Sequence, residues 1–401
     1  MGLRQDAGYL TSNLLPRVPD MHAQAIERAV HAIFAQTELH AKQVVSIAHA
    51  VVGVAHAAQA GVAHIGRAAA AARGTEPKHG IKQFDRFLSN EKIDLEVALD
   101  DYLRFVLGNR WKIVVALDWT DYALGTQHRI ALNLITRHGR ATPLVWKTVT
   151  SAELTKRRNH HEDELLRTFK WLLPDSIKQV IVLADRGFGD VELYDMLKGE
   201  LGFDYLIRFR KCIKVRDAAG TARRGGEWVP HNGSALLLPN AKVTGKKFEV
   251  AAVVAVKDAA MKEEWLLATS LTAQAAAKIV ALYGRRFTIE ENFRDEKDWR
   301  FGFGSLYVDI KEPARRDKLC LVIAIAIVLL TLLGSAGEKL GLDRMLRANT
   351  VKRRTHSLFR QGREYLRGAV GKLHDALGRL WKSFWDAFAH QQSVTEEWGF
   401  I

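Results

Sequence analysis

Three carboxylates stand at positions from which they could serve one site. Asp118 ends the apolar segment KIVVALD, and Asp185 ends the apolar segment IKQVIVLAD. Both segments are predicted strands, and functional sites of mixed sheets form where strands end. The third acid, Glu290, lies in a segment where helical patterning resumes at Thr272. Asp118 and Asp185 alone leave open a simpler interpretation, in which each is a turn or cap residue after its strand.

The predicted helix around Glu290 carries a distinctive set of side chains on one face. At 3.6 residues per turn, four side chains fall within an arc of about 60° around the helix axis. They are an aromatic hydroxyl, a guanidinium, a carboxylate and an ammonium group, from Tyr283, Arg286, Glu290 and Lys297. The alternative is a solvated face with ion pairs between residues four apart. That alternative does not predict a single acid among cations directly after a basic segment, so we favour a functional face.

These residue types suit the cleavage of phosphodiester bonds. Two or three carboxylates can hold two Mg²⁺ ions about 4 Å apart, and Mn²⁺ accepts the same hard oxygen ligands. One ion activates water or a 3′-hydroxyl, and the other stabilises the leaving oxygen. Arg and Lys beside the acids would bind the flanking phosphates. We therefore expect Asp118, Asp185 and Glu290 to be catalytic metal ligands.

The spacing on this helix resembles a known protein family. Tyr283, Arg286, Glu290 and Lys297 are separated by two, three and six residues. These four residue types at this spacing resemble the signature of the insertion-sequence-four family of bacterial cut-and-paste DDE transposases. The contexts VVALDWTD around Asp118 and VLADRGFGD around Asp185 also resemble that family's first two acids. The resemblance covers most of the chain and implies cleavage through hairpin ends.

The resemblance implies roles for two more residues. In this family a Trp in a W-L-L-x-T-S context stacks on a base flipped out near the transposon end, and Trp265 stands in WLLATS. Such stacking contributes about 1–3 kcal/mol per base, although a core Trp is the alternative. Arg294 matches a position where the family often has another basic DNA contact. The family also has a β-rich insertion between its second Asp and its Glu, which here lie 105 residues apart.

The charge balance favours a polyanionic partner. The chain has 401 residues, with 59 Lys and Arg against 45 Asp and Glu, and a formal net charge of +14. Its 48% of hydrophobic residues excludes a disordered polycation, and its two cysteines exclude a disulfide framework or a Cys-based zinc site. Residues 201–250 hold ten basic and four acidic side chains. We expect DNA contacts there from Arg210, Lys211 and Lys214.

The order of the predicted elements indicates an α/β protein with a ribonuclease-H-like mixed sheet. Strands are expected at 112–119, 128–135, 143–150, 177–185 and 203–209, with helices at 160–173 and 189–200. We predict five regions: a helical N-terminal domain for DNA-end recognition (1–108), a first part of the catalytic core (109–210), a β-rich insertion (211–270), a second part of the core (271–350) and a C-terminal helical segment (351–401).

Three local patterns favour structural roles. Asn159 and Glu162 have the spacing of a capping box, which would start the next helix. The HHED run at 160–163 has metal-binding residue types, but acids in a first helical turn favour the helix dipole, so no metal is expected there. The apolar segment 319–333 has 15 residues, and a membrane span needs about 20. It is predicted to be a buried helix, with no membrane partner.

Together these patterns predict a DNA transposase that carries out metal-dependent phosphodiester hydrolysis and strand transfer. We expect it to bind double-stranded DNA, both the inverted-repeat ends of its insertion sequence and the target, as a homodimer in the synaptic complex. A bacterial cytoplasmic, nucleoid-associated location follows. One alternative is a structure-specific nuclease on the same core, which a strand-joining assay would distinguish. The other is an inactive DNA-binding derivative, which metal-dependent cleavage of a cognate end would exclude.

Overall fold

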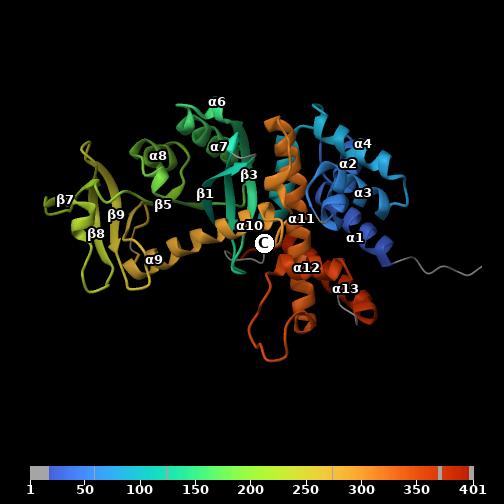
Figure 1. Ribbon diagram of the computed structural model, residues 1–401. Coiled ribbons are helices and arrows are strands. Elements are labelled where there is room, and N and C mark those ends of the chain that lie inside the picture. Colours follow the sequence, from blue (N-terminus) through green and yellow to red (C-terminus); the bar gives the residue numbers. More distant parts are fainter. Residues whose placement is uncertain (1–17, 58, 123–124, 273, 369–372, 397–401) are drawn as a thin grey trace, which may run out of the picture.

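The computed structural model consists of a helical N-terminal region, a central sheet and a set of C-terminal helices (Figure 1). It describes residues 18–57, 59–122, 125–272, 274–368 and 373–396. The strands of the insertion lie at one end of the molecule and the N-terminal helices at the other (Figure 1). The segment that carries Glu290 runs between them.

The N-terminal region is helical, as predicted. Its elements are α1 (Val18–Ile33), α2 (Ala41–His56), α3 (Val62–Ala72), α4 (Pro77–Ser89) and α5 (Leu95–Leu107). Asp94 caps α5 by accepting hydrogen bonds from two backbone amides, and Gly108, with a φ of 56°, ends it. Helices α3 and α4 are in close contact because Gly66 and Gly80 face each other, where any added Cβ would meet backbone atoms.

The core of the sheet has the predicted meander followed by two parallel strands. Its strands are β1 (Lys112–Tyr122), β2 (Gln127–Ile135), β3 (Ala141–Thr150), β4 (Gln179–Ala184) and β5 (Asp204–Arg208). They lie in the order β3-β2-β1-β4-β5, with β1 antiparallel to β2 and parallel to β4. Residues 113–117 of β1 are fully buried, as the unbroken apolar run predicts. This mixed arrangement is ribonuclease-H-like, which confirms the predicted fold.

The segment after β5 is rich in strands and continues the same sheet. It contains β6 (Lys214–Arg216), β7 (Ala222–Arg224), the turn η4 (Gly225–Trp228), β8 (Leu236–Val243), β9 (Phe248–Val256) and β10 (Trp265–Thr269). Strand β10 pairs with β5 on one side and with β9 on the other, so ten strands form one sheet. The insertion is therefore hydrogen-bonded to the core through β10.

The helices between the strands differ in detail from the predicted ones. They are α6 (Ser151–Leu154), α7 (Arg158–Leu172), the turn η2 (Arg186–Phe188), α8 (Val191–Asp195) and the π-helical turn η3 (Met196–Glu200). The predicted capping box at Asn159 is wrong, because α7 already starts at Arg158 and Asn159 binds Asp190 instead. A capping box is formed earlier, between Thr150 and Glu153 at the start of α6. Glu162 thus lies in the second turn of α7, beyond the first turn in which an acid is stabilised by the helix dipole.

The helical segment around Glu290 has two α-helices instead of one continuous helix. Helix α9 (Ala276–Gly284) starts four residues later than Thr272, and the single turn η5 (Arg285–Phe287) separates it from α10 (Thr288–Lys297). A 3₁₀ turn is more tightly wound than an α-helix, so the arc worked out for a continuous helix holds only locally.

A long apolar helix, α11 (Pro313–Lys339), packs against β3, α2 and the C-terminal helices α12 (Leu358–Leu366) and α13 (Leu373–Gln392). The short turns η6 (Ser305–Tyr307) and η7 (Leu342–Leu346) flank it. Helix α11 is long and apolar enough to cross a membrane, but 94% of its apolar window is buried inside the protein, as in a core helix. Gly334 of α11 and Gly362 of α12 allow the two helices to approach at backbone contact.

Candidate active site

Asp118 and Asp185 come at matching positions of the neighbouring parallel strands β1 and β4. The last pair in their parallel register is Leu117 with Ala184, and each acid is the next residue along the chain. Asp185 directly follows β4, as predicted, but the prediction that Asp118 ends its strand is wrong, because β1 continues to Tyr122 by pairing with β2. Both carboxylates accept short backbone hydrogen bonds, from the amide of Trp119 at 2.9 Å and of Gly187 at 2.7 Å.

A buried guanidinium links Asp118 to Glu290. Arg286 Nη1 lies 3.3 Å from Asp118 Oδ2, and Arg286 Nη2 donates to Glu290 Oε1 at 2.9 Å. Arg286 is buried, whereas Glu290 is exposed on the first turn of α10. Turn η5 thus places the guanidinium between the strand acid and the helix acid. Arg286 is buried against Asp118 of β1, so this part of the face is not solvated, although Arg286 and the exposed Glu290 do form the ion pair between residues four apart that the alternative predicts.

The three acids influence one another. Burial raises the pKa of Asp118 to about 6; Arg286 opposes the rise, while Asp185 and Glu290 add to it. Among the described residues, no group of three or more His, Cys, Asp or Glu side chains is arranged to hold a metal ion. The acids therefore form a cluster of negative charge that Arg286 partly compensates, instead of a finished ligand shell.

Two further contacts fix α10 on the sheet. Lys297 Nζ donates to Thr120 Oγ1 at 2.7 Å and to Asp121 O at 2.8 Å, both on β1. Glu296 accepts from Arg129 Nη2 of β2 at 2.5 Å, and both side chains are buried. Burial lowers the pKa of Lys297. The structure ties the ammonium of Lys297 to the protein, so this residue positions the helix that carries Glu290.

Three aromatic rings lie beside the acids. Trp265 opens β10, and its ring meets Tyr283 edge to face at 5.0 Å and Phe287 at 6.0 Å. Tyr283 is buried, and this burial raises its pKa to about 12. Phe287 is exposed, and Arg286 lies over its ring at 4.7 Å. Phe287 was not predicted as a site residue, although it lies next to Arg286 in the sequence.

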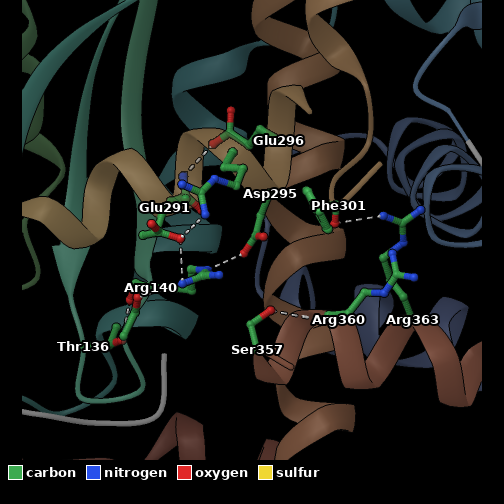
Figure 2. Close-up of polar contacts among 12 residues, drawn as sticks. Thr136, Arg140, Glu291, Asp295, Glu296, Phe301, Ser357, Arg360 and Arg363 are labelled. Carbon is green, nitrogen blue, oxygen red and sulfur yellow. Dashed lines mark hydrogen bonds and ion pairs between the residues drawn. The ribbon is translucent and has the colours of Figure 1, made fainter. Parts of the chain in front are cut away.

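Arg294 is exposed one turn beyond Glu290 and belongs to a network of charges on α10. It pairs with Glu291 at 3.0 Å. Arg140, just before β3, pairs with Glu291 at 3.1 Å and with the buried Asp295 at 2.9 Å (Figure 2). These pairs align α10 with the β2–β3 turn and leave the surface basic at Arg294.

The predicted DNA contacts of the insertion lie at its base, near the acids. Arg210 and Lys211 line a pocket of about 430 Å³ together with Arg186, which follows Asp185 directly. Within it, Glu263 accepts from Arg208 at 2.7 Å and from Arg186 at 3.1 Å. Lys214 is exposed at the start of β6, which lies next to the edge strand β7. The basic residues therefore extend from the second acid along the strands of the insertion.

Glu162 is a neighbour of the site that the sequence did not identify. It accepts a hydrogen bond from the indole of Trp119 at 2.7 Å, and Trp119 follows Asp118. Arg158 also reaches Glu162, at 3.3 Å, and lies over the Trp119 ring at 5.0 Å. Burial raises the pKa of Glu162. The HHED run contained this residue, but only the packing of α7 on the sheet brings it to Trp119.

Comparison with known proteins agrees with this geometry. A family model described as a transposase DDE domain matches residues 114–329, which is more than half of the chain. The matched segment contains β1, β4, the insertion and α10, and thus all three acids. No match was found among curated proteins. With its ribonuclease-H-like sheet and a match of this length, the chain belongs to the transposase DDE domain family.

Proposed function

We propose that this protein is the transposase of an insertion sequence of the insertion-sequence-four type. In this proposal it binds the inverted-repeat ends, hydrolyses one strand to free a 3′-hydroxyl, forms and reopens a hairpin, and joins the end to target DNA. The observation that carries the proposal is the bridge from Arg286 to Asp118 and Glu290, next to Asp185. It joins Arg286 and Glu290 of the four-residue signature to Asp118.

The acids fit divalent metal ions in donor chemistry and charge. All three offer hard oxygen ligands, which suit Mg²⁺ and Mn²⁺. The pKa of Asp118 is raised mainly by burial, and the negative charges of Asp185 and Glu290 add to the rise. Asp118, Asp185 and Glu290 would hold the ions. Bound there, two ions would activate a hydroxyl nucleophile and stabilise the leaving oxygen. Asp118 must be ionised to act as a ligand, and with a pKa of about 6 it is mostly ionised at neutral pH.

Other side chains would bind and orient the DNA. Arg286 compensates the carboxylates in the free protein, and its fork of donors suits a phosphate once the carboxylates have another counter-charge. Tyr283 keeps its proton, because its pKa is about 12, and its hydroxyl can donate to a phosphate oxygen. Lys297, at the end of α10, would contribute positive charge from its place against β1. Arg294, Arg210, Lys211 and Lys214 would bind phosphates farther along the duplex.

Trp265 would receive the base that leaves the stack when the hairpin forms. Its ring lies beside Tyr283 and the exposed Phe287, so a flipped base could stack near the acids. Stacking offsets part of the unstacking cost of a few kcal/mol. We further propose that the protein acts as a homodimer on paired ends and works on DNA in the bacterial cytoplasm.

The test is a cleavage and joining assay on a labelled inverted-repeat end with Mg²⁺. Replacing Asp118, Asp185 or Glu290 by Ala should abolish nicking while DNA binding persists. Asp121→Asn is a matched control, because Asp121 is an exposed acid on the same strand, bonded to His128. Joined products distinguish a transposase from a nuclease that only cleaves. Near wild-type nicking by any of the three Ala variants would refute the assignment of that acid.

A further inference from the structure

The turn that follows α10 exposes three large aromatic rings within nine residues. Trp299 is 52% exposed, Phe301 57% and Tyr307 69%. Among the described residues, only two other Phe, Tyr or Trp side chains are this exposed, Trp111 and Trp171; Phe287 beside the acids is exposed to a lesser degree. Soluble proteins rarely leave such rings in water without a use for them, so this segment has the features of a binding surface.

The turn is held firmly although its rings are exposed. Asp298 Oδ1 accepts from the amides of Arg300 at 2.7 Å and Phe301 at 2.8 Å. Two arginines of α12 bind the carbonyls of the same turn: Arg360 reaches Arg300 O at 3.2 Å, and Arg363 reaches Gly302 O at 2.5 Å. Arg363 also reaches Phe301 O, at 3.4 Å (Figure 2). A rigid turn fixes the exposed rings in advance, which lowers the entropy cost of binding.

Two pockets flank this turn, and they differ in chemistry. One, of about 490 Å³, lies between Trp299 and Tyr307 and is also lined by Gln59 and His64 of the N-terminal region. It offers aromatic faces together with an amide and an imidazole. The backbone amide of Ala60 donates to Phe303 O at 2.7 Å, which joins the two regions at this pocket. Its lining suits a planar heterocycle with polar edges.

The other pocket, of about 270 Å³, is lined by basic groups. Its lining includes the guanidinium groups of Arg294, Arg300, Arg360 and Arg140 and the carboxylate of Asp295. Glu291 and Glu364 also pair with three of these arginines, which leaves four positive charges against three negative ones. The guanidinium of Arg300 lies 5.0 Å from the centre of the Trp299 ring and pairs with no carboxylate among the described residues. Because positive charge exceeds negative charge, this pocket suits phosphate groups.

We propose that this turn, Trp299–Tyr307, together with Arg294 and Arg360 binds an unpaired stretch of DNA strand next to the reacting end. The proposal rests on the proposed function, and it adds a surface about two helical turns beyond Glu290. Bases of the strand stack on Trp299, Phe301 and Tyr307 while its phosphates lie against the guanidinium groups. Exposed rings between cations are typical of single-strand binding, because only unpaired bases offer free faces for stacking.

The test compares a blunt duplex with the same duplex carrying a single-stranded oligothymidine tail. Binding of the full-length protein is measured by fluorescence anisotropy in EDTA, so that no cleavage occurs. We expect the tail to tighten binding about tenfold and Trp299→Ala to remove most of that gain. Trp299→Phe should retain most of the gain, because it keeps an aromatic face. Trp171→Ala is the matched control, since Trp171 is 72% exposed on α7.

The outcomes separate this inference from the proposed function. Equal affinity for blunt and tailed duplexes would refute the single-strand surface and leave duplex binding intact. A loss in Trp299→Ala no larger than in Trp171→Ala would also refute it. Failure of the wild-type protein to bind either DNA would overturn both this inference and the proposed function. A tail preference that depends on Trp299 and is kept by Phe would support the inference.

Discussion

Asp118→Asn should change how the stability of the metal-free protein depends on pH. The Asp118 side chain is only 20% exposed, and its pKa is about 6 instead of the ordinary 3.8. At about 1.36 kcal/mol per pH unit, this difference amounts to about 3 kcal/mol. Between these two pH values the folded protein keeps the proton that the unfolded chain has lost. The contribution of Asp118 to the free energy of unfolding therefore falls as the pH rises from about 4 to 6.

Asn carries no titrating proton, so the variant lacks this pH-dependent loss. In urea denaturation with EDTA, the variant should gain about 3 kcal/mol relative to wild type between pH 4 and pH 7. Other buried acids, such as Asp295 with a pKa of about 6, contribute equally to both proteins and cancel. Asp121→Asn is the control, and its difference from wild type should stay within about 0.5 kcal/mol. A pH-independent difference for Asp118→Asn would refute the burial of this charge.

The same pair of proteins tests metal binding without any DNA. At pH 7, Mg²⁺ should raise the free energy of unfolding of the wild-type protein, because the folded state alone would hold the ion. Asp118→Asn should show little of this rise. An equal rise in both proteins would place the metal elsewhere.

Three other predictions follow from the site and its supports. Trp265→Ala should leave nicking nearly intact but slow hairpin formation about tenfold, as expected if the transition state loses about 1.4 kcal/mol of stacking. A time course that resolves nicked and hairpin products measures this, and equal slowing of both steps would indicate a packing role for Trp265. DNA affinity should fall steeply with salt, with a log-log slope of about −0.9 per phosphate neutralised, and Arg210→Ala should reduce that slope by about 1, whereas an unchanged slope would exclude a phosphate contact. Gly334→Val should destabilise the protein by about 1–3 kcal/mol or more in thermal unfolding, because its side chain would meet the backbone of α12, whereas Gly245→Ala, with open space around it, should stay within about 0.5 kcal/mol.

The five strands of the core could be predicted from the sequence because their signals are local, and their succession with the helices indicated the ribonuclease-H-like sheet. An unbroken apolar run such as that of β1 identifies a buried strand, and the acid that follows the run was found in the same way, although β1 continues beyond it. The four-residue spacing around Glu290 identified the helix acid. Sequence position alone was thus enough to select Asp118, Asp185 and Glu290 as candidate site residues. Their catalytic roles stay predictions.

What could not be predicted depends on contacts between distant segments. The bridge through Arg286 requires the 3₁₀ turn η5, which a regular helical repeat does not indicate. Glu162 reaches Trp119 only because α7 packs on the sheet. Helix α7 starts at Arg158 without the predicted cap at Asn159, and the capping box of Thr150 and Glu153 starts the short helix α6, which the sequence analysis did not predict. The bounds of an element are less predictable from sequence than its presence.

The pairing of β5 with β10 brings the two ends of the insertion together. Arg208 lies opposite Leu267, so the 58 residues between them leave and return at neighbouring points of one sheet. A segment with adjacent ends can be exchanged for another of different length with little entropy cost to the rest of the chain. Related proteins could therefore acquire new DNA specificities by replacing this inserted segment while the acids stay in place. The same property makes it a natural position for grafting a foreign DNA-binding module in engineering work.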